Sequence, residues 1–95
     1  MNLGLEGRRA IILGGSRGIG WYTACELAAE GCSVAICARD GDGVQAAVDA
    51  LSQDPGGSHF GAAADLADGD ATRAFVREAV TALGGLDLLL SLIHI

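Results

Sequence analysis

Short apolar runs alternate with longer amphipathic segments along this chain from Arg9 onward. The runs over 10–13 and 33–38 are apolar without polar alternation, which is typical of strands buried on both faces of a parallel sheet. A weaker, Ala-rich run over 59–64 and an apolar run over 86–90 predict two more strands. The pattern therefore predicts four strands separated by three segments of helical length.

The first of these segments predicts a helix over 18–30. Ile19, Thr23 and Leu27 recur there at every fourth residue, and small residues beside them allow close packing on a sheet. Gly31 follows as a stop signal. At this helical spacing, Ile19 would be apolar in any core.

The two later segments carry their own signals. Apolar residues at i, i+3, i+4 and i+7 predict a helix over 43–52. Asp68 or Asp70 can cap a third helix, which should end at Gly84. Strands alternating with helices favour right-handed crossovers and helices on both faces of one sheet. The expected fold class is α/β, the first half of a Rossmann-type doubly wound parallel sheet with the order β-α-β-α-β-α-β.

Composition and charge narrow the range of functions that this chain can have. A chain of 95 residues forms one domain at most, and a hydrophobic content of 51% is enough for a core. The formal charge of -6 disfavours nucleic acid and anionic membranes as partners. All six basic residues are Arg, so chemistry that needs a lysine, such as a Schiff base or a P-loop, has no residue to perform it.

Three cysteines point to a reducing compartment, because their number is odd and no Cys-x-x-Cys spacing occurs. We expect Cys25, Cys32 and Cys37 to be buried packing residues rather than metal ligands. No apolar run has the length of a membrane span or a signal-peptide core. The expected location is therefore cytoplasmic, with no metal site.

The spacing Gly-x-x-x-Gly-x-Gly occurs where the first strand meets the first helix, at Gly14, Gly18 and Gly20. A helix N-terminus at such a junction presents unpaired backbone N–H groups and a positive dipole end, so it can hold a pyrophosphate where no side chain blocks the approach. The spacing is not that of a nucleoside-triphosphate loop. A tight strand-to-helix turn without a ligand is the alternative.

This sequence resembles the short-chain dehydrogenase/reductase family, whose members usually carry Thr-Gly-x-x-x-Gly-x-Gly at this junction. The resemblance extends from Leu5 to Leu89 and includes the glycine loop, the Asp65-Leu66 pair and the Gly-Gly-Leu-Asp run that ends at Asp87. Leu13 stands where the family usually has Thr, which removes a hydroxyl from the loop. The resemblance implies an oxidoreductase that transfers hydride between a nicotinamide and a carbonyl or alcohol substrate.

The cofactor is predicted from charge. An acidic residue about 20 positions beyond the glycine loop binds the ribose 2'-hydroxyl of NAD, whereas an Arg there accommodates the 2'-phosphate of NADP. Arg39 occupies this position, and Arg17 in the loop is a second cation. We expect NADP rather than NAD, although Asp40 could restore an acid near the ribose. Solvated surface charges are the alternative interpretation of both arginines.

The resemblance implies further cofactor contacts. Asp65 matches the family's adenine-binding Asp, with the backbone of Leu66 beside it, and its alternative role is that of a turn or cap residue. Ser16 is expected to donate to phosphate or to serve the turn alone. Ile19 should pack near the pyrophosphate and the nicotinamide end. The predicted cofactor-binding residues are therefore Gly14, Ser16, Arg17, Gly18, Ile19, Gly20, Arg39, Asp65 and Leu66.

Other conspicuous side chains carry less chemistry. His59 is expected to be structural or exposed. Trp21 and Tyr22 should pack, and Tyr22 cannot match the family's catalytic tyrosine because no lysine lies four residues on. Asp87 receives no catalytic role.

The catalytic Ser, Tyr and Lys of the family have no counterpart here, so we expect these 95 residues to be inactive alone. Residues 1–89 are expected to be the N-terminal part of an NAD(P)-binding Rossmann domain. Residues 90–95 match the translation of a transposase mosaic end used in library preparation, so we expect a non-native read-through tail; a genuine extension of the fourth strand is the alternative.

Two other functions stay open. A non-catalytic dinucleotide-binding module would need no more chain, and a methyltransferase is disfavoured because Arg39 stands where an acid would bind the ribose hydroxyls. The family's activities include 3-oxoacyl-carrier-protein reduction, but the substrate cannot be chosen from these residues. The resemblance also implies that the complete protein forms a homo-oligomer.

Overall fold

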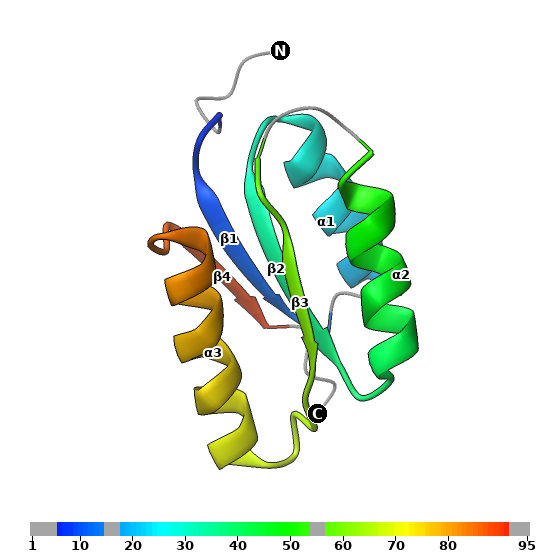
Figure 1. Cartoon of the computed structure of the whole chain (residues 1–95), viewed down its shortest axis with the longest axis vertical. Coiled ribbons are helices and arrows are strands. Elements are labelled where there is room, and N and C mark those ends of the chain that lie inside the picture. The colour runs from blue at the N-terminus through cyan, green and yellow to red at the C-terminus, as the bar shows by residue number, and fades with distance from the viewer. Residues whose placement is uncertain (1–5, 15–17, 54–56, 92–95) are drawn as a thin grey trace.

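The computed structural model describes residues 6–14, 18–53 and 57–91. Its elements alternate as predicted (Figure 1). They are β1 (Arg9–Leu13), α1 (Gly18–Ala29), β2 (Ser33–Ala38), α2 (Gly41–Leu51), β3 (Phe60–Ala63), α3 (Gly69–Leu83) and β4 (Leu88–Ser91). No described helix has the length and apolar character that crossing a membrane requires.

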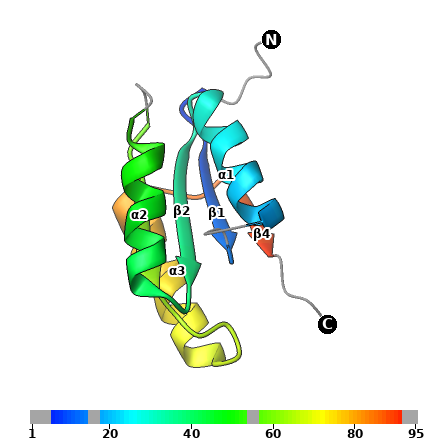
Figure 2. The same ribbon diagram turned by 90° about the vertical axis from the view of Figure 1, so that its right-hand side faces the viewer.

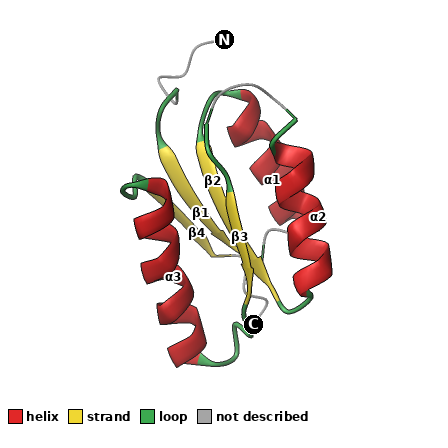
Figure 3. Ribbon diagram, in the orientation of Figure 1, coloured by secondary structure: helices red, strands yellow, loops and turns green. Residues whose placement is uncertain are grey.

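The four strands form one parallel sheet in the order β3-β2-β1-β4. Helices α1 and α2 cover one face and α3 covers the other, as Figures 1 and 2 show together. The chain thus runs outward from β1 to β3 and then crosses back on the opposite face to β4, with the layers distinguished in Figure 3. This arrangement confirms the predicted doubly wound α/β fold.

Successive residues of the central strands point to opposite faces, so the core has two parts. Ile12, Val34 and Ile36 pack with α1 and α2, whereas Ile11 and Cys37 pack with α3. All five side chains are fully buried. The two apolar runs without alternation, β1 and β2, therefore contribute side chains to both parts of the core, as expected for strands covered on each face.

The small residues of α1 face the sheet. Gly20, Ala24 and Ala28 are its buried residues. Ile19 is 76% exposed and Tyr22 is 68% exposed, so the expectation that Tyr22 packs was wrong, and Ile19 is not part of the core. Their places at the interface are taken by residues that let the helix backbone approach β1 and β2 closely.

Capping aspartates fix where the other two helices begin. Asp68 caps α3, and its Oδ1 accepts from the backbone N–H groups of Asp70 at 2.9 Å and Ala71 at 3.2 Å. Gly84, at φ 82°, ends the same helix in the left-handed conformation. Asp40 caps α2, which begins at Gly41, two residues earlier than predicted. A short side-chain acceptor is the preferred group at such a position.

An edge-strand glycine allows α2 to pack against β3. A Cβ atom added at Gly61 would lie 2.5 Å from Cγ2 of Val48 and 2.6 Å from Cγ1 of Val44. Carbon atoms in favourable contact are about 3.5–4.0 Å apart. Only a residue without a side chain fits there unless the helix shifts.

Arg9 and Asp87 join the amino ends of β1 and β4. Asp87 Oδ2 accepts from the backbone N–H of Arg9 at 2.9 Å and from its Nε at 3.1 Å. Arg9 Nη1 also donates to the carbonyl of Gly84 at 3.0 Å. These hydrogen bonds lower the pKa of Asp87 below its ordinary value, the backbone N–H of Arg9 contributing most. We name this group the Arg9–Asp87 clamp.

β4 pairs with β1 along one side, with Ala10 opposite Leu88 and Leu13 opposite Ser91. Leu90 packs against the core, whereas Leu89 is 51% exposed. The strand therefore includes the first two residues of the segment expected to be a read-through tail. Residues 92–95 lie outside the described part of the chain.

Candidate cofactor site

Three predicted site residues lie just beyond strands that end at one edge of the sheet: Gly14 follows β1, Arg39 follows β2, and Asp65 comes two residues after β3. Leu13 is paired with Cys37, and Ala38 is paired with Ala63, so β1, β2 and β3 end side by side. The pairing continues past the strands, because Gly14 N–H donates to the Cys37 carbonyl at 2.9 Å. In Figure 1 this carboxyl edge lies at the lower end of the sheet, where the arrowheads point. Ligands of open α/β sheets bind at this edge.

The connection from β1 to α1 needs glycine for its backbone. Gly14 has φ 93° and Gly18 has φ 67°, a region that residues with a Cβ rarely adopt. A Cβ placed on Gly18, the first residue of α1, would meet no described atom within 4 Å. Unpaired backbone N–H groups at a helix start attract anions. Ser16 and Arg17, also predicted here, lie outside the described residues.

Leu66, which follows β3 in the sequence, lies beside the glycine connection between β1 and α1. Its Cδ1 lies 3.7 Å from the position of a Cβ on Gly14, an ordinary van der Waals distance. The half-buried side chain packs against the core cluster that contains Leu13 and Cys37. The fold thus places Leu66 beside Gly14, although 52 positions (66 minus 14) separate them in the sequence.

Asp65 lies at the same edge, where its side chain forms a turn. Oδ1 accepts from the backbone N–H of Ala67 at 2.9 Å, and the Asp65 carbonyl accepts from Asp68 N–H at 2.9 Å. The exposed carboxylate is therefore oriented by the chain itself. The turn role that the sequence left open for Asp65 is observed.

Arg39 is exposed in the two-residue connection between β2 and α2. It forms no ion pair with another residue of the described part of the chain. Asp40 beside it accepts from the backbone N–H of Asp42 at 3.1 Å through Oδ1. Sequence reasoning considered Asp40 only as a possible ribose ligand and missed its capping role. Its position immediately before the helix, with Gly41 next, was the signal.

Two other titratable side chains are structural. Nδ1 of His59 accepts from the backbone N–H of Val34 at 3.2 Å, which confirms the structural interpretation. Asp87 serves the Arg9–Asp87 clamp at the opposite end of the sheet from the glycine connection. In the sequence the clamp is visible only as an Arg at the start of one predicted strand and an Asp at the start of another. Nothing in the sequence shows that these two strands are neighbours.

Two of the three cysteines, Cys32 and Cys37, are buried as predicted. Burial raises the pKa values of Cys32 and Cys37; at Cys37 the backbone N–H of Gly14 opposes part of this effect. Cys25 is only partly buried, but it packs against the core cluster on the side of α1 and α2. Thiols kept protonated are poor nucleophiles.

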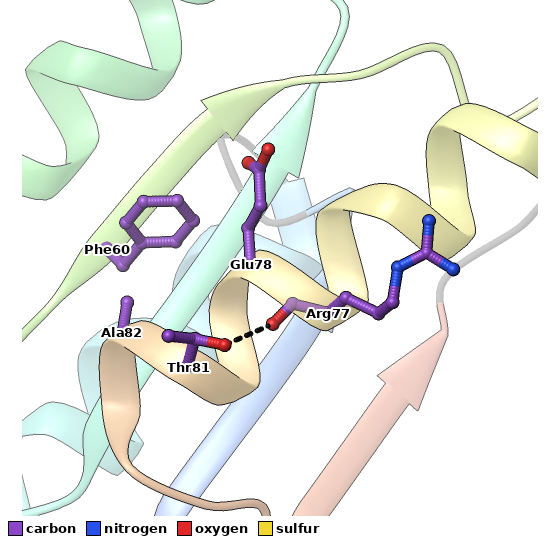
Figure 4. A pocket seen from close by; sticks show the side chains of 5 residues that line it. All are labelled: Phe60, Arg77, Glu78, Thr81 and Ala82. Carbon is purple, nitrogen blue, oxygen red and sulfur yellow. Dashed lines mark hydrogen bonds between the residues drawn. The ribbon is translucent and has the colours of Figure 1, made fainter.

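A separate hollow of about 400 Å³ lies between α3 and the start of β3 (Figure 4). Phe60 reaches it from the strand, and Glu78 and Ala82 reach it from the helix. The Thr81 hydroxyl donates to the Arg77 carbonyl at 3.0 Å. None of the predicted site residues lines this hollow. Across the described ranges, no group of three His, Cys, Asp or Glu side chains could hold a metal ion.

A family model described as short chain dehydrogenase matches residues 8–91. The chain is 37% identical over 83 residues to glucose 1-dehydrogenase of Gluconobacter oxydans, a match that covers 87% of this chain and 31% of that protein. It is 35% identical over 85 residues to a 3-oxoacyl-acyl-carrier-protein reductase of Staphylococcus aureus, covering 88% of this chain and 34% of the relative.

Among solved structures, a short-chain dehydrogenase/reductase from Serratia marcescens superposes with a TM-score of 0.85 at 39% identity. That match covers 92% of this chain and 36% of the Serratia chain. This chain therefore spans about a third of the length of the relatives it matches. The similarity includes the β1–α1 connection and the ends of β2 and β3, because the matched family region runs through all of them.

Proposed function

The chain belongs to the short-chain dehydrogenase family, and from that premise we propose that it forms the cofactor-binding part of an NADP-dependent oxidoreductase. The enzyme would transfer hydride between the nicotinamide and a carbonyl or alcohol substrate. One observation carries the proposal: α1 starts at Gly18, where an added Cβ would meet no described atom, at the edge where β1, β2 and β3 end. Residues 1–89 are the proposed N-terminal part of this domain.

The described residues fit a dinucleotide at this edge. Gly18 contributes no side chain at the start of α1, and a Cβ there would meet no described atom, which suits a pyrophosphate that approaches the first N–H groups of the helix. Gly20 is buried and lets α1 lie close to the sheet. Gly14, Ser16 and Arg17 complete the proposed phosphate loop. Asp65 and Leu66 would hold the adenine end.

NADP is the proposed cofactor because a cation follows β2. Arg39 is exposed and unpaired among the described residues, so its guanidinium is available to a 2'-phosphate. The acid beside it, Asp40, is engaged with the start of α2. Arg17 is a second proposed cation for the same phosphate. NAD is the less favoured cofactor.

The bound cofactor would supply the hydride chemistry, and the residues of this chain would bind and orient it. Ile19 presents an exposed apolar side chain on the first turn of α1, where it would contact the cofactor near the pyrophosphate. No catalytic acid or base is proposed within these residues. The family resemblance implies that a serine, a tyrosine and a lysine elsewhere in the enzyme orient the substrate and move the proton.

The substrate is proposed only as a class. One relative is named for glucose and another for a 3-oxoacyl carrier-protein substrate, and both names describe carbonyl or alcohol chemistry. A 3-oxoacyl-carrier-protein reductase is one member of the proposed class. A homo-oligomeric enzyme in the cytoplasm is also proposed.

The test measures NADPH and NADH binding by the full-length protein and by Arg39→Asp. Loss of a charge-assisted hydrogen bond costs about 1.5–3 kcal/mol, so we expect NADPH affinity to fall roughly 10- to 100-fold and NADH affinity to change little. Arg77→Asp is the control, because it makes the same charge change on α3. Equal losses for both cofactors would show that Arg39 does not bind the 2'-phosphate.

A second experiment concerns the gene. Sequencing the source DNA past the codon for Leu89 tests the proposal that residues 90–95 are read-through. A frame that continues into the family's catalytic residues would support it. The same frame ending at Ile95 in independent clones would contradict it and favour a non-catalytic dinucleotide-binding module.

A further inference from the structure

A carboxylate stands next to the cation that would bind the 2'-phosphate. Asp40 directly follows Arg39, and both residues lie between β2 and α2 at the carboxyl edge of the sheet. In the sequence this acid competes with Arg39 as a determinant of cofactor choice, since an acid at this edge binds a ribose 2'-hydroxyl in NAD-dependent folds. The structure gives it another role.

Both oxygens of the Asp40 carboxylate face the first turn of α2. Oδ1 accepts from the backbone N–H of Asp42 at 3.1 Å. Oδ2 lies 3.0 Å from the position that a Cβ on Gly43 would take. The Asp40 carbonyl also accepts from Val44 N–H at 3.0 Å, and its backbone is extended, at φ -90° and ψ 103°. This is the geometry of a helix N-cap.

The cap determines what Asp40 can do. A carboxylate that accepts from a helix N–H is favoured by the positive end of the helix dipole, so it would have to give up this interaction to bind a ribose hydroxyl. Its negative charge nevertheless stays one residue from Arg39. A 2'-phosphate held by Arg39 would therefore approach a like charge, and the dipole of α2 that would attract it is already opposed by a carboxylate.

We propose that Asp40 is a positioning residue that caps α2 and, through its charge, limits how strongly Arg39 favours NADP over NAD. The proposal rests on the proposed function and deepens it. Asp40 would have no contact with the cofactor and would act through the helix start and through electrostatic repulsion. Removing its charge while keeping its cap should therefore sharpen the preference for NADP.

Three variants of the full-length protein separate the cap from the charge. Asp40→Ser keeps a capping oxygen and removes the charge, whereas Asp40→Ala removes both. Asp49→Asn is matched to them in net charge, because Asp49 is exposed near the far end of α2, where it accepts from Gln45 Nε2 at 3.0 Å. Dissociation constants for NADPH and NADH are measured by nicotinamide fluorescence at low and high salt.

The expected result is a gain in affinity for NADPH only. Asp40→Ser should bind NADPH on the order of three- to tenfold more tightly at low salt, with NADH affinity changed less than twofold. The gain should shrink at high salt because screening weakens the repulsion. Asp49→Asn should give no such gain. Asp40→Ala should have a lower melting temperature than Asp40→Ser, because it alone loses the cap.

Other outcomes overturn the proposal. A loss of threefold or more in NADH or NADPH affinity in Asp40→Ser would mean that the carboxylate contacts the cofactor. Unchanged affinities for both would mean that its charge has no influence. Failure of the proposed function gives different results. The unmodified protein would then bind neither cofactor, or Arg39→Asp would weaken NADPH and NADH binding equally while Asp40→Ser changed neither affinity.

Discussion

Replacing Gly61 with Ala should destabilise the protein although alanine is ordinarily acceptable in a strand. The added Cβ would lie 2.5 Å from Cγ2 of Val48 and 2.6 Å from Cγ1 of Val44. A favourable separation is about 3.5 Å or more, so β3 and α2 would have to move apart by about 1 Å. Overpacking of this kind costs about 1–3 kcal/mol.

A second glycine provides the reference for this cost. Gly69 begins α3, and the nearest atom to a Cβ there would belong to the guanidinium of Arg73, at 3.4 Å. Both Gly→Ala changes restrict the unfolded chain and stabilise by about 0.4–1 kcal/mol on that account. This contribution cancels when the variants are compared, so Gly61→Ala should be about 1–3 kcal/mol less stable than Gly69→Ala.

The assay is thermal unfolding of the full-length protein followed by circular dichroism. In a protein of about 150–250 residues, 1 kcal/mol shifts the melting temperature by about 2–4 °C, so the two variants should differ by about 2–12 °C. Val48→Ala removes one of the two clashing methyl groups, and adding it to Gly61→Ala should give a favourable coupling of about 0.5–3 kcal/mol. Equal melting temperatures for Gly61→Ala and Gly69→Ala would refute the packing argument.

Three further predictions concern other parts of the fold. The lowered pKa of Asp87 means that its stabilising contribution is present above the ordinary carboxyl pKa of about 4 and is lost as the pH falls through the folded-state value. The stability difference between the unmodified protein and Asp87→Asn should therefore shrink between about pH 5 and pH 2 in urea titrations; a difference independent of pH would contradict the clamp. The 95-residue chain expressed alone should be poorly soluble because the outer edge of β4 is apolar, and Leu89→Lys should improve its solubility in sedimentation assays, whereas sharp cooperative melting of the unmodified monomer would count against this. Ile19→Ala should change stability by less than about 0.5 kcal/mol, since the side chain is exposed, but should weaken NADPH binding in fluorescence titrations; unchanged binding would remove Ile19 from the site.

The buried strands and the order of elements could be predicted because their signals are local. An apolar run without alternation has one economical interpretation, and β2 has the predicted bounds, Ser33–Ala38. Gly84 ends α3 as expected, because a left-handed residue at a helix end is most easily glycine. The glycine connection at Gly14 and Gly18 was found for the same reason, since its backbone angles require that residue type.

The orientation of α1 could not be predicted from hydrophobicity. The large side chain of Tyr22 was expected to pack, yet the sheet requires the smallest residues at the contact, and Ala24 and Ala28 provide them. The sequence also left the role of Asp40 open, because whether a carboxylate caps a helix or faces a ligand depends on backbone angles at one residue.

The position of β1 between β2 and β4 has a consequence for synthesis on the ribosome. Ala10 pairs with Val34 soon after both are made, but its other partner is Leu88, 78 residues later (88 minus 10). At about 5–20 residues per second, one side of β1 stays without its partner strand for roughly 4–16 s. The pairing of β1 with β4 joins residues far apart in the sequence, and contacts of this kind slow folding. During that interval, the unpaired side of β1 is open to wrong pairing and to chaperones.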